Sequence, residues 1–289
     1  RNNFSFSPDG KKIAFTAARS LNIADAVQST VAVVDVETSV IRHLTSGHDN
    51  WDETPIFSPD GSKIIFSRTS LNDFPTDNKL LIVPAVGATL SELHVSTETV
   101  DHQPLLLDWT TSGIHVFFLN RTKQLVARID PDTGISHPLA GSPDTITLAD
   151  VSPDGQTIAA LGHSGEVPSD VYRIDRDGSE RVTRAAEITA KWPHHNADLV
   201  RWRAEDGLDV EGLLYSRTDR KPRQDSPLIV VLHGGPRGRR YRGAVDSLER
   251  HRGRCHHHHG LHAAPHTGLR PGALEAAPRA RSQTADRRS

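Results

Sequence analysis

The sequence has 289 residues, enough for about two domains, but only 36% of them are apolar and 5% aromatic, which is low for a globular protein. Acidic and basic residues nearly balance at 36 and 34, so the formal net charge is -2. One cysteine excludes an intramolecular disulfide framework, and no apolar run approaches the roughly 18 to 20 residues of a membrane-spanning helix.

The charge is distributed unevenly along the chain. From Arg237 onward there are twelve Arg and no Lys against four acidic residues, which leaves 22 basic and 32 acidic residues before it. The first 236 residues are therefore mildly acidic, which argues against a nucleic-acid-binding surface there. A strand pattern begins directly after Arg1 and the chain contains no Met, so we expect the sequence to begin inside a longer protein.

An internal repeat of strand, Ser-Pro-Asp-Gly turn and strand runs through the first two thirds of the chain. Its turns begin at Ser7, Ser58 and Ser152, and a degenerate copy contains Thr110 at the matching position. The steps of 51, 52 and 42 residues match the roughly 40 to 50 residues of a four-stranded propeller blade. Pro presets φ, Asp bonds the local backbone and Gly accepts a positive φ, so we interpret the recurring Asp as a turn residue and not as a catalytic acid.

A second hairpin follows within the repeats, with apolar strands at 30–35, 79–83 and 124–130. Asp52-x-x-Pro55 and Asp101-x-x-Pro104 occupy matching places before two of the turns and are expected to be structural. We predict about four blades, over residues 1–50, 51–100, 101–145 and 146–192.

After residue 195 the pattern changes to two short strands joined by Asp206-Gly207, and then to the apolar run 228–232 followed by His-Gly-Gly-Pro at 233–236. A continuous apolar run of this kind is typical of a strand buried on both faces of a parallel sheet. The pattern predicts the beginning of a second domain.

Ser-Pro-Asp-Gly repeats, an Asp-Gly hairpin and His-Gly-Gly-Pro in this order resemble the acylaminoacyl-peptidase and dipeptidyl-peptidase branch of the prolyl oligopeptidase family. The resemblance implies a β-propeller that gates substrate size and an α/β-hydrolase domain that hydrolyses peptides through a Ser, Asp and His triad. It also implies an oxyanion-hole loop at His233, Gly234, Gly235 and Pro236, with the Gly235 N–H as donor, His233 and Gly234 shaping the loop and Pro236 stiffening its exit. The alternative interpretation of this loop is a plain turn after a strand.

The triad itself is expected to be missing from this chain. The nucleophile should follow the loop as Gly-x-Ser-x-Gly, but Ser247, Ser282 and Ser289 do not lie between glycines at that spacing. His233 precedes that position and does not qualify as the triad histidine. The parent protein is thus predicted to be a serine peptidase, and this chain is expected to be inactive.

The last segment, 237–289, is basic and of low complexity, which predicts either a disordered tail or translation in a shifted frame. Cys255-His-His-His-His259 offers enough ligands for a transition metal, but nothing in the pattern predicts a fold that would hold them apart. We therefore expect no metal site and no cofactor.

The sequence accordingly predicts a partial all-β propeller over 1–195, the first strands of an α/β-hydrolase domain over 196–236, and the tail. Peptides are the expected substrate of the parent, with no nucleic-acid or membrane partner. The compartment, cytoplasmic or periplasmic, and the oligomeric state are left open. The rival hypothesis is a TolB-like propeller that binds a partner without catalysis, although a lone propeller has no use for the apolar run at 228–232.

Overall fold

The computed structural model describes residues 4–18, 20, 28–70, 78–87, 89–95, 101–120, 122–139, 143–164, 167–189, 195–217, 228–230, 258–259 and 262–263. Within these ranges the fold is almost entirely β, with one short helix, α1 (Ala185–Thr189). No helix in the described part is long and apolar enough to cross a membrane.

Sixteen strands in the described ranges form four antiparallel units of four strands, each following chain order. Blade 1 contains β1 (Phe4–Phe6), β2 (Lys12–Ala18), β3 (Ser29–Asp35) and β4 (Ile41–His43). Blade 2 contains β5 (Asn50–Phe57), β6 (Lys63–Ser70), β7 (Lys79–Pro84) and β8 (Ser91–Leu93). Blade 3 contains β9 (Asp101–Thr110), β10 (Gly113–Asn120), β11 (Lys123–Ile129) and β12 (Ser136–Pro138). Blade 4 contains β13 (Thr145–Val151), β14 (Ile158–Ser164), β15 (Val167–Asp175) and β16 (Gly178–Arg181).

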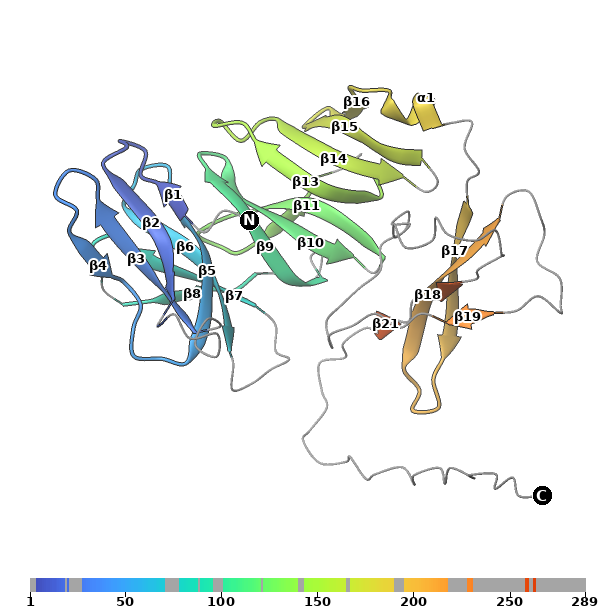
Figure 1. Cartoon of the computed structure of the whole chain (residues 1–289), viewed down its shortest axis with the longest axis horizontal. Coiled ribbons are helices and arrows are strands. Elements are labelled where there is room, and N and C mark those ends of the chain that lie inside the picture. Colours follow the sequence, from blue (N-terminus) through green and yellow to red (C-terminus); the bar gives the residue numbers. More distant parts are fainter. Residues whose placement is uncertain are drawn as a thin grey trace, which may run out of the picture.

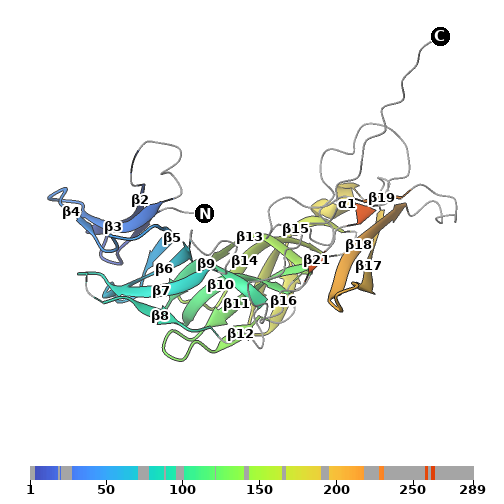
Figure 2. The same cartoon turned by 90° about the horizontal axis from the view of Figure 1, so that it is seen from below.

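The blades stand side by side in chain order, as the colours of Figure 1 show, and Figure 2 shows blade 1 and blade 4 at opposite ends of the row. Single parallel bridges, Ser29 to Trp51 and Gln124 to Thr145, join blade 1 to blade 2 and blade 3 to blade 4. The first strands of successive blades also contact one another, β1 with β5, β5 with β9 and β9 with β13. These features are those of propeller blades, and they confirm the predicted all-β propeller class.

The core lies between the blade faces. Phe66 and Ile64 are buried between blades 1 and 2, and Phe118 and Ile114 between blades 2 and 3. Val126 packs with Ile146, Ile158 and Ile174 between blades 3 and 4. Stacked apolar faces therefore hold successive blades together by burying surface that each sheet alone would expose.

The predicted turns have the chemistry expected of them. Ser7, Ser58 and Ser152 each donate a side-chain hydrogen bond of 2.6 Å to the Asp two residues on. The glycine of the second turn, Gly61, has φ of 71°, a left-handed conformation that favours glycine. The recurring Asp is thus a turn residue, as predicted.

The segment after the blades forms the antiparallel hairpin β17 (His195–Arg203) and β18 (Asp209–Arg217). Gly207 closes its turn with φ of 86°, and the Leu208 N–H donates to Asp206. Three short strands complete this sheet: β19 (Ile229–Val230), β20 (His258–His259) and β21 (His262–Ala263).

Candidate functional site

The predicted oxyanion-hole loop, His233, Gly234, Gly235 and Pro236, lies outside the described residues. Only the beginning of the strand that leads to it is described. Leu228, Ile229 and Val230 are 56%, 39% and 53% exposed, and β19 pairs in parallel with β20. The described residues of this run are thus not buried on both faces, because β20 is their one described strand partner and no described helix covers them.

The tail contributes two short strands to this sheet. His259 pairs with Leu214, and His262 with Glu211, both through antiparallel β18 contacts. In the described part of the chain no group of three His, Cys, Asp or Glu side chains is placed to hold a metal ion.

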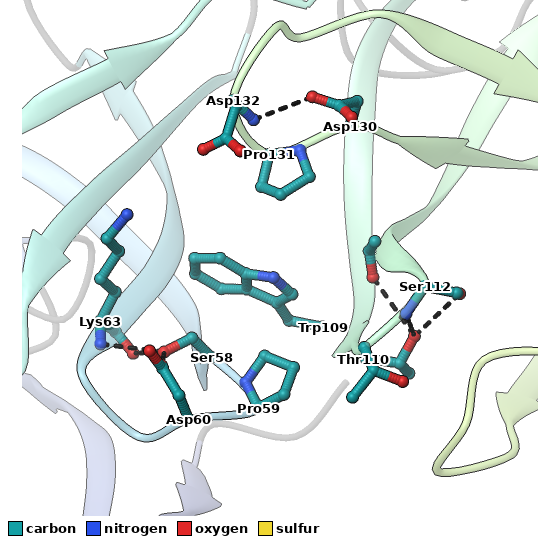
Figure 3. A pocket seen from close by; sticks show the side chains of 12 residues that line it. Ser58, Pro59, Asp60, Lys63, Trp109, Thr110, Ser112, Asp130, Pro131 and Asp132 are labelled. Carbon is teal, nitrogen blue, oxygen red and sulfur yellow. Dashed lines mark hydrogen bonds between the residues drawn. The ribbon is translucent and has the colours of Figure 1, made fainter.

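A cavity of about 390 Å³ lies between blades 2 and 3, on the side of the Ser-Pro-Asp-Gly turns. Trp109 lies at its centre among the labelled residues, with Pro59 and Pro131 on different sides of it (Figure 3). Three carboxylates line the cavity, those of Asp60, Asp130 and Asp132.

Two of these carboxylates, those of Asp60 and Asp130, accept hydrogen bonds from their own turns. Hydrogen bonds from the Ser58 hydroxyl and from Ser62 lower the pKa of Asp60 to about 2. The Thr133 N–H and hydroxyl similarly lower the pKa of Asp130. The Ser58 hydroxyl donates to the Asp60 carboxylate, whose low pKa makes it a weak general base, so this contact does not activate Ser58 as a nucleophile.

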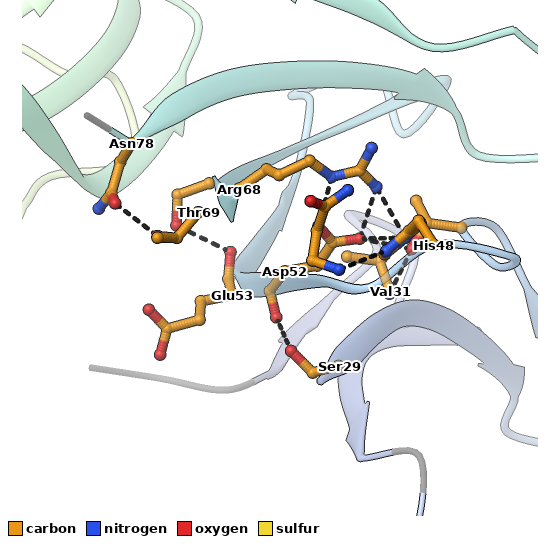
Figure 4. Close-up of polar contacts among 11 residues, drawn as sticks. Ser29, Val31, His48, Asp52, Glu53, Arg68, Thr69 and Asn78 are labelled. Atoms are coloured by element: carbon orange, nitrogen blue, oxygen red, sulfur yellow. Dashed lines mark hydrogen bonds and ion pairs between the residues drawn. The ribbon is translucent and has the colours of Figure 1, made fainter. Parts of the chain in front are cut away.

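A buried carboxylate, Asp52, lies at the opposite end of β5 from that cavity, next to the joint between blades 1 and 2 (Figure 4). Arg68 donates to it from Nε at 2.6 Å and from Nη2 at 2.8 Å. The Thr45 hydroxyl donates to Oδ2 at 2.7 Å and accepts the Val31 N–H at 2.8 Å. The cluster thus ties β3 of blade 1 to β5 and β6 of blade 2.

His48 completes this cluster, with Nε2 3.2 Å from Asp52 Oδ2. The Asn50 N–H donates to Nδ1 at 3.1 Å, and Arg68 Nη2 lies 2.9 Å from Nε2, so both ring nitrogens have polar partners. Burial lowers the pKa of His48, and the nearby Arg68 guanidinium lowers it further, against the opposing effect of Asp52.

An Asp-His pair of this geometry resembles two thirds of a catalytic triad, but in the described part of the chain no serine hydroxyl is shown against the ring. In a triad the ring nitrogen away from the carboxylate faces a serine hydroxyl. Here that nitrogen accepts a backbone N–H, and the hydroxyl of Ser29 donates to the Asp52 carbonyl oxygen at 2.6 Å. The cluster therefore joins blades and does not activate a nucleophile.

Comparisons with known proteins support the peptidase resemblance. No family model matches the chain. Dipeptidyl-peptidase 5 of Porphyromonas gingivalis is 26% identical over 242 residues, which cover 81% of this chain and 35% of that protein. A probable dipeptidyl-peptidase 5 of Aspergillus niger is 24% identical over 168 residues, 55% of this chain and 22% of that protein.

The sequence similarity to dipeptidyl-peptidase 5 supports a peptidase of the prolyl oligopeptidase family. A solved puromycin-hydrolyzing peptidase of Mycobacterium tuberculosis, 19% identical, superposes with a TM-score of 0.61 over 89% of this chain and 40% of that one, a likeness of fold. The chain thus spans between about a fifth and two fifths of the length of these family relatives.

Sequence reasoning did not find His48 and Arg68 as partners of Asp52. Arg68 lies between Ser67 and Thr69 in the polar second half of β6, so no local signal marked it as a buried charge. The Asp52-x-x-Pro55 motif was correctly interpreted as structural.

Proposed function

We propose that this chain is the propeller portion, with the first strands of the α/β-hydrolase domain, of a serine-type peptidase. The observation that carries the proposal is the order of its parts: propeller blades, then the β17–β18 hairpin, then His-Gly-Gly-Pro, in a chain related to dipeptidyl-peptidases 5. Peptides are the proposed substrates of the whole protein, and the propeller would limit their size.

The proposed chemistry is acyl transfer to a serine, with a histidine as general base and an aspartate that orients it. Gly235 would supply one oxyanion donor through its backbone N–H, because a glycine lets the backbone approach the reacting carbonyl closely. His233 and Gly234 would shape that loop, and Pro236 would stiffen its exit.

The chain by itself is expected to show no peptidase activity. An oxyanion donor stabilises charge only after a nucleophile has attacked, and no serine hydroxyl is shown on the His48 ring of the Asp52–His48 pair among the described residues. The purified chain should be assayed with dipeptidyl and N-acylated chromogenic substrates, with and without a serine-reactive fluorophosphonate. Turnover that the fluorophosphonate abolishes would require an active serine in this chain and would contradict the expectation.

The class of the parent can be tested on its coding DNA. We expect one of the other two reading frames past codon 236 to encode Gly-x-Ser-x-Gly, followed by an Asp and then a His. Recovery of these motifs would support both the serine mechanism and the shifted-frame origin of the tail. If neither frame contains them in that order, both the shifted-frame interpretation and the proposed serine mechanism lose their support.

A further inference from the structure

The turn between β9 and β10 is shorter than the corresponding turn of the other three blades. Gly113 pairs directly with Thr110, so this turn has two residues. In blade 2 the Ser58 N–H donates to the Lys63 carbonyl at 2.8 Å, which leaves a turn of four residues. The Ser-Pro-Asp-Gly turns of blades 1 and 4 make the same bond. Blade 3 therefore reaches less far toward its neighbours at this end of its strands.

The short turn leaves a gap between blades 2 and 3, whereas the turns at the other two blade interfaces touch. A Cβ atom on Gly61 would lie 3.3 Å from Pro8 of blade 1, and the Ser112 hydroxyl of blade 3 donates to the Gly155 carbonyl of blade 4 at 3.1 Å. Around the equivalent Gly113 of blade 3, the three nearest atoms all belong to β11 of its own blade. The cavity of about 390 Å³ occupies this gap, and its volume is within the range of small-ligand sites, about 300–1,000 Å³. Blades 1 and 4 flank the two blades that form it, so the cavity belongs to the interior of the row.

A tryptophan lines this cavity at the position where the other three blades have Phe or Val before the turn. Trp109 is 8% exposed, and Pro59 and Pro131 lie on different sides of its ring (Figure 3). Its backbone N–H donates to Asp108, but its indole N–H donates to no acceptor among the described residues. A buried indole N–H usually has a hydrogen-bond partner. The cavity therefore offers a ligand an open donor beside an apolar ring.

The polar lining of the cavity has an excess of negative charge. It contains the carboxylates of Asp60, Asp130 and Asp132 and one ammonium group, that of Lys63. Hydrogen bonds within its turn hold the pKa of Asp60 at about 2, so this carboxylate is charged at neutral pH. The Asp132 carboxylate forms no hydrogen bond or ion pair with another described residue, so it is open to a ligand. An aromatic ring with carboxylates around it favours an organic cation.

We propose that the cavity between blades 2 and 3 binds the side chain of an arginine or lysine residue of a peptide. The cationic group lies at the Asp60 and Asp132 carboxylates, and the aliphatic stem packs on Trp109 and on the prolines at its sides. A main-chain carbonyl of the same peptide accepts the open indole N–H. A bare metal ion would leave that N–H without an acceptor, and a neutral or acidic side chain lacks the charge that the lining selects.

The test is a titration of the ¹⁵N-labelled full chain with the capped pentapeptide acetyl-Gly-Gly-Arg-Gly-Gly-amide, followed by NMR of the indole N–H signals. The chain has four tryptophans, and the Trp109 signal is identified as the one missing from Trp109→Phe. This signal is expected to shift saturably, and the signals of the other three tryptophans are expected to stay in place. Citrulline in place of arginine removes the charge and keeps the shape of the side chain, and should weaken binding about tenfold. Because binding is measured without turnover, its outcome is independent of the proposed peptidase activity.

Asp132→Asn tests the open carboxylate without disturbing the turn, which is held by hydrogen bonds to Asp130. This variant is expected to bind the arginine peptide several-fold more weakly, and added salt should weaken binding to the unmodified chain. Asp177→Asn is the matched control. In blade 4 the Asp177 N–H donates to Asp175 as the Asp132 N–H does to Asp130, but Asp177 does not line the cavity, so binding should be unchanged. Far-UV circular dichroism and a thermal melt check that each variant is folded.

The proposal is overturned if the Trp109 signal does not move at millimolar concentrations of the arginine peptide. It is also overturned if the citrulline peptide binds as tightly as the arginine peptide, or if Asp132→Asn and Asp177→Asn bind equally well. An equal shift with acetyl-Gly-Gly-Glu-Gly-Gly-amide would show that the cavity accepts peptides regardless of charge, which contradicts selection of a cation.

Discussion

Replacing Asp52 by alanine is expected to lower the free energy of unfolding by about 3–5 kcal/mol, the usual effect of removing one partner from a buried ion pair. The carboxylate is fully buried and accepts hydrogen bonds from Arg68 and Thr45, so its loss leaves the Arg68 charge largely buried without its partner. Urea unfolding followed by tryptophan fluorescence, at one fixed protein concentration, measures the change.

Asp177→Ala is the matched control. Its carboxylate pairs with Arg176 at 3.6 Å, but both side chains are at least 80% exposed. Exposed pairs of this kind contribute about 0–1 kcal/mol, so the control should shift the urea midpoint little. Equal shifts for the two variants would show that the Asp52 cluster does not hold blades 1 and 2 together.

The protein is expected to lose stability as the pH falls from 6.5 toward 4, with His115 as the largest single histidine contribution. Burial of the ring, assisted by Arg128, lowers the pKa of His115 from 6.5 to about 4. Between these values the unfolded chain binds more protons than the folded one, so stability is complete above pH 6.5 and decreases below it. The loss attributable to His115 is on the order of 2–3 kcal/mol. Burial also lowers the pKa of His163, and His48 shifts in the same direction, so both add to the slope.

Urea unfolding of the unmodified chain and of His115→Phe at pH 7 and at pH 4.5 tests this assignment. Phe removes the titrating group and keeps an apolar ring on β10, so the variant should lose less stability on acidification. The difference in unfolding free energy between the two proteins at pH 7 measures any packing defect that the substitution causes. Identical losses for both proteins would place the acid sensitivity elsewhere.

The blades could be predicted because their signals are local. A turn such as Ser58 to Gly61 is specified by residues within four positions of one another, and the flanking strands by alternation over a few residues. The short outer strands β8 and β12 were not predicted, because Ser-Glu-Leu and Ser-His-Pro show no alternation of apolar and polar residues.

The interfaces between blades could not be predicted in the same way. Arg68 meets Asp52 across 16 positions, and the Ser29 hydroxyl reaches the Asp52 carbonyl across 23, contacts that only the packed fold brings together. The predicted loop at 233–236 lies outside the described residues, so Gly235 as an oxyanion donor stays a prediction. The peptidase resemblance of the chain, which the sequence comparisons support, was predicted from motif order, since order along a chain is visible without any contact information.

The single bridges between blades also bear on how the chain folds. Within each blade, every strand pairs with its neighbour in the sequence. Between the described blades, strand pairing is limited to the bridges Ser29 to Trp51 and Gln124 to Thr145. The pairings within a blade join strands that are close in sequence, so they close small loops and form quickly. A blade can therefore acquire its hydrogen bonds while the next is still being synthesised, and the apolar faces of the two blades pack together afterwards.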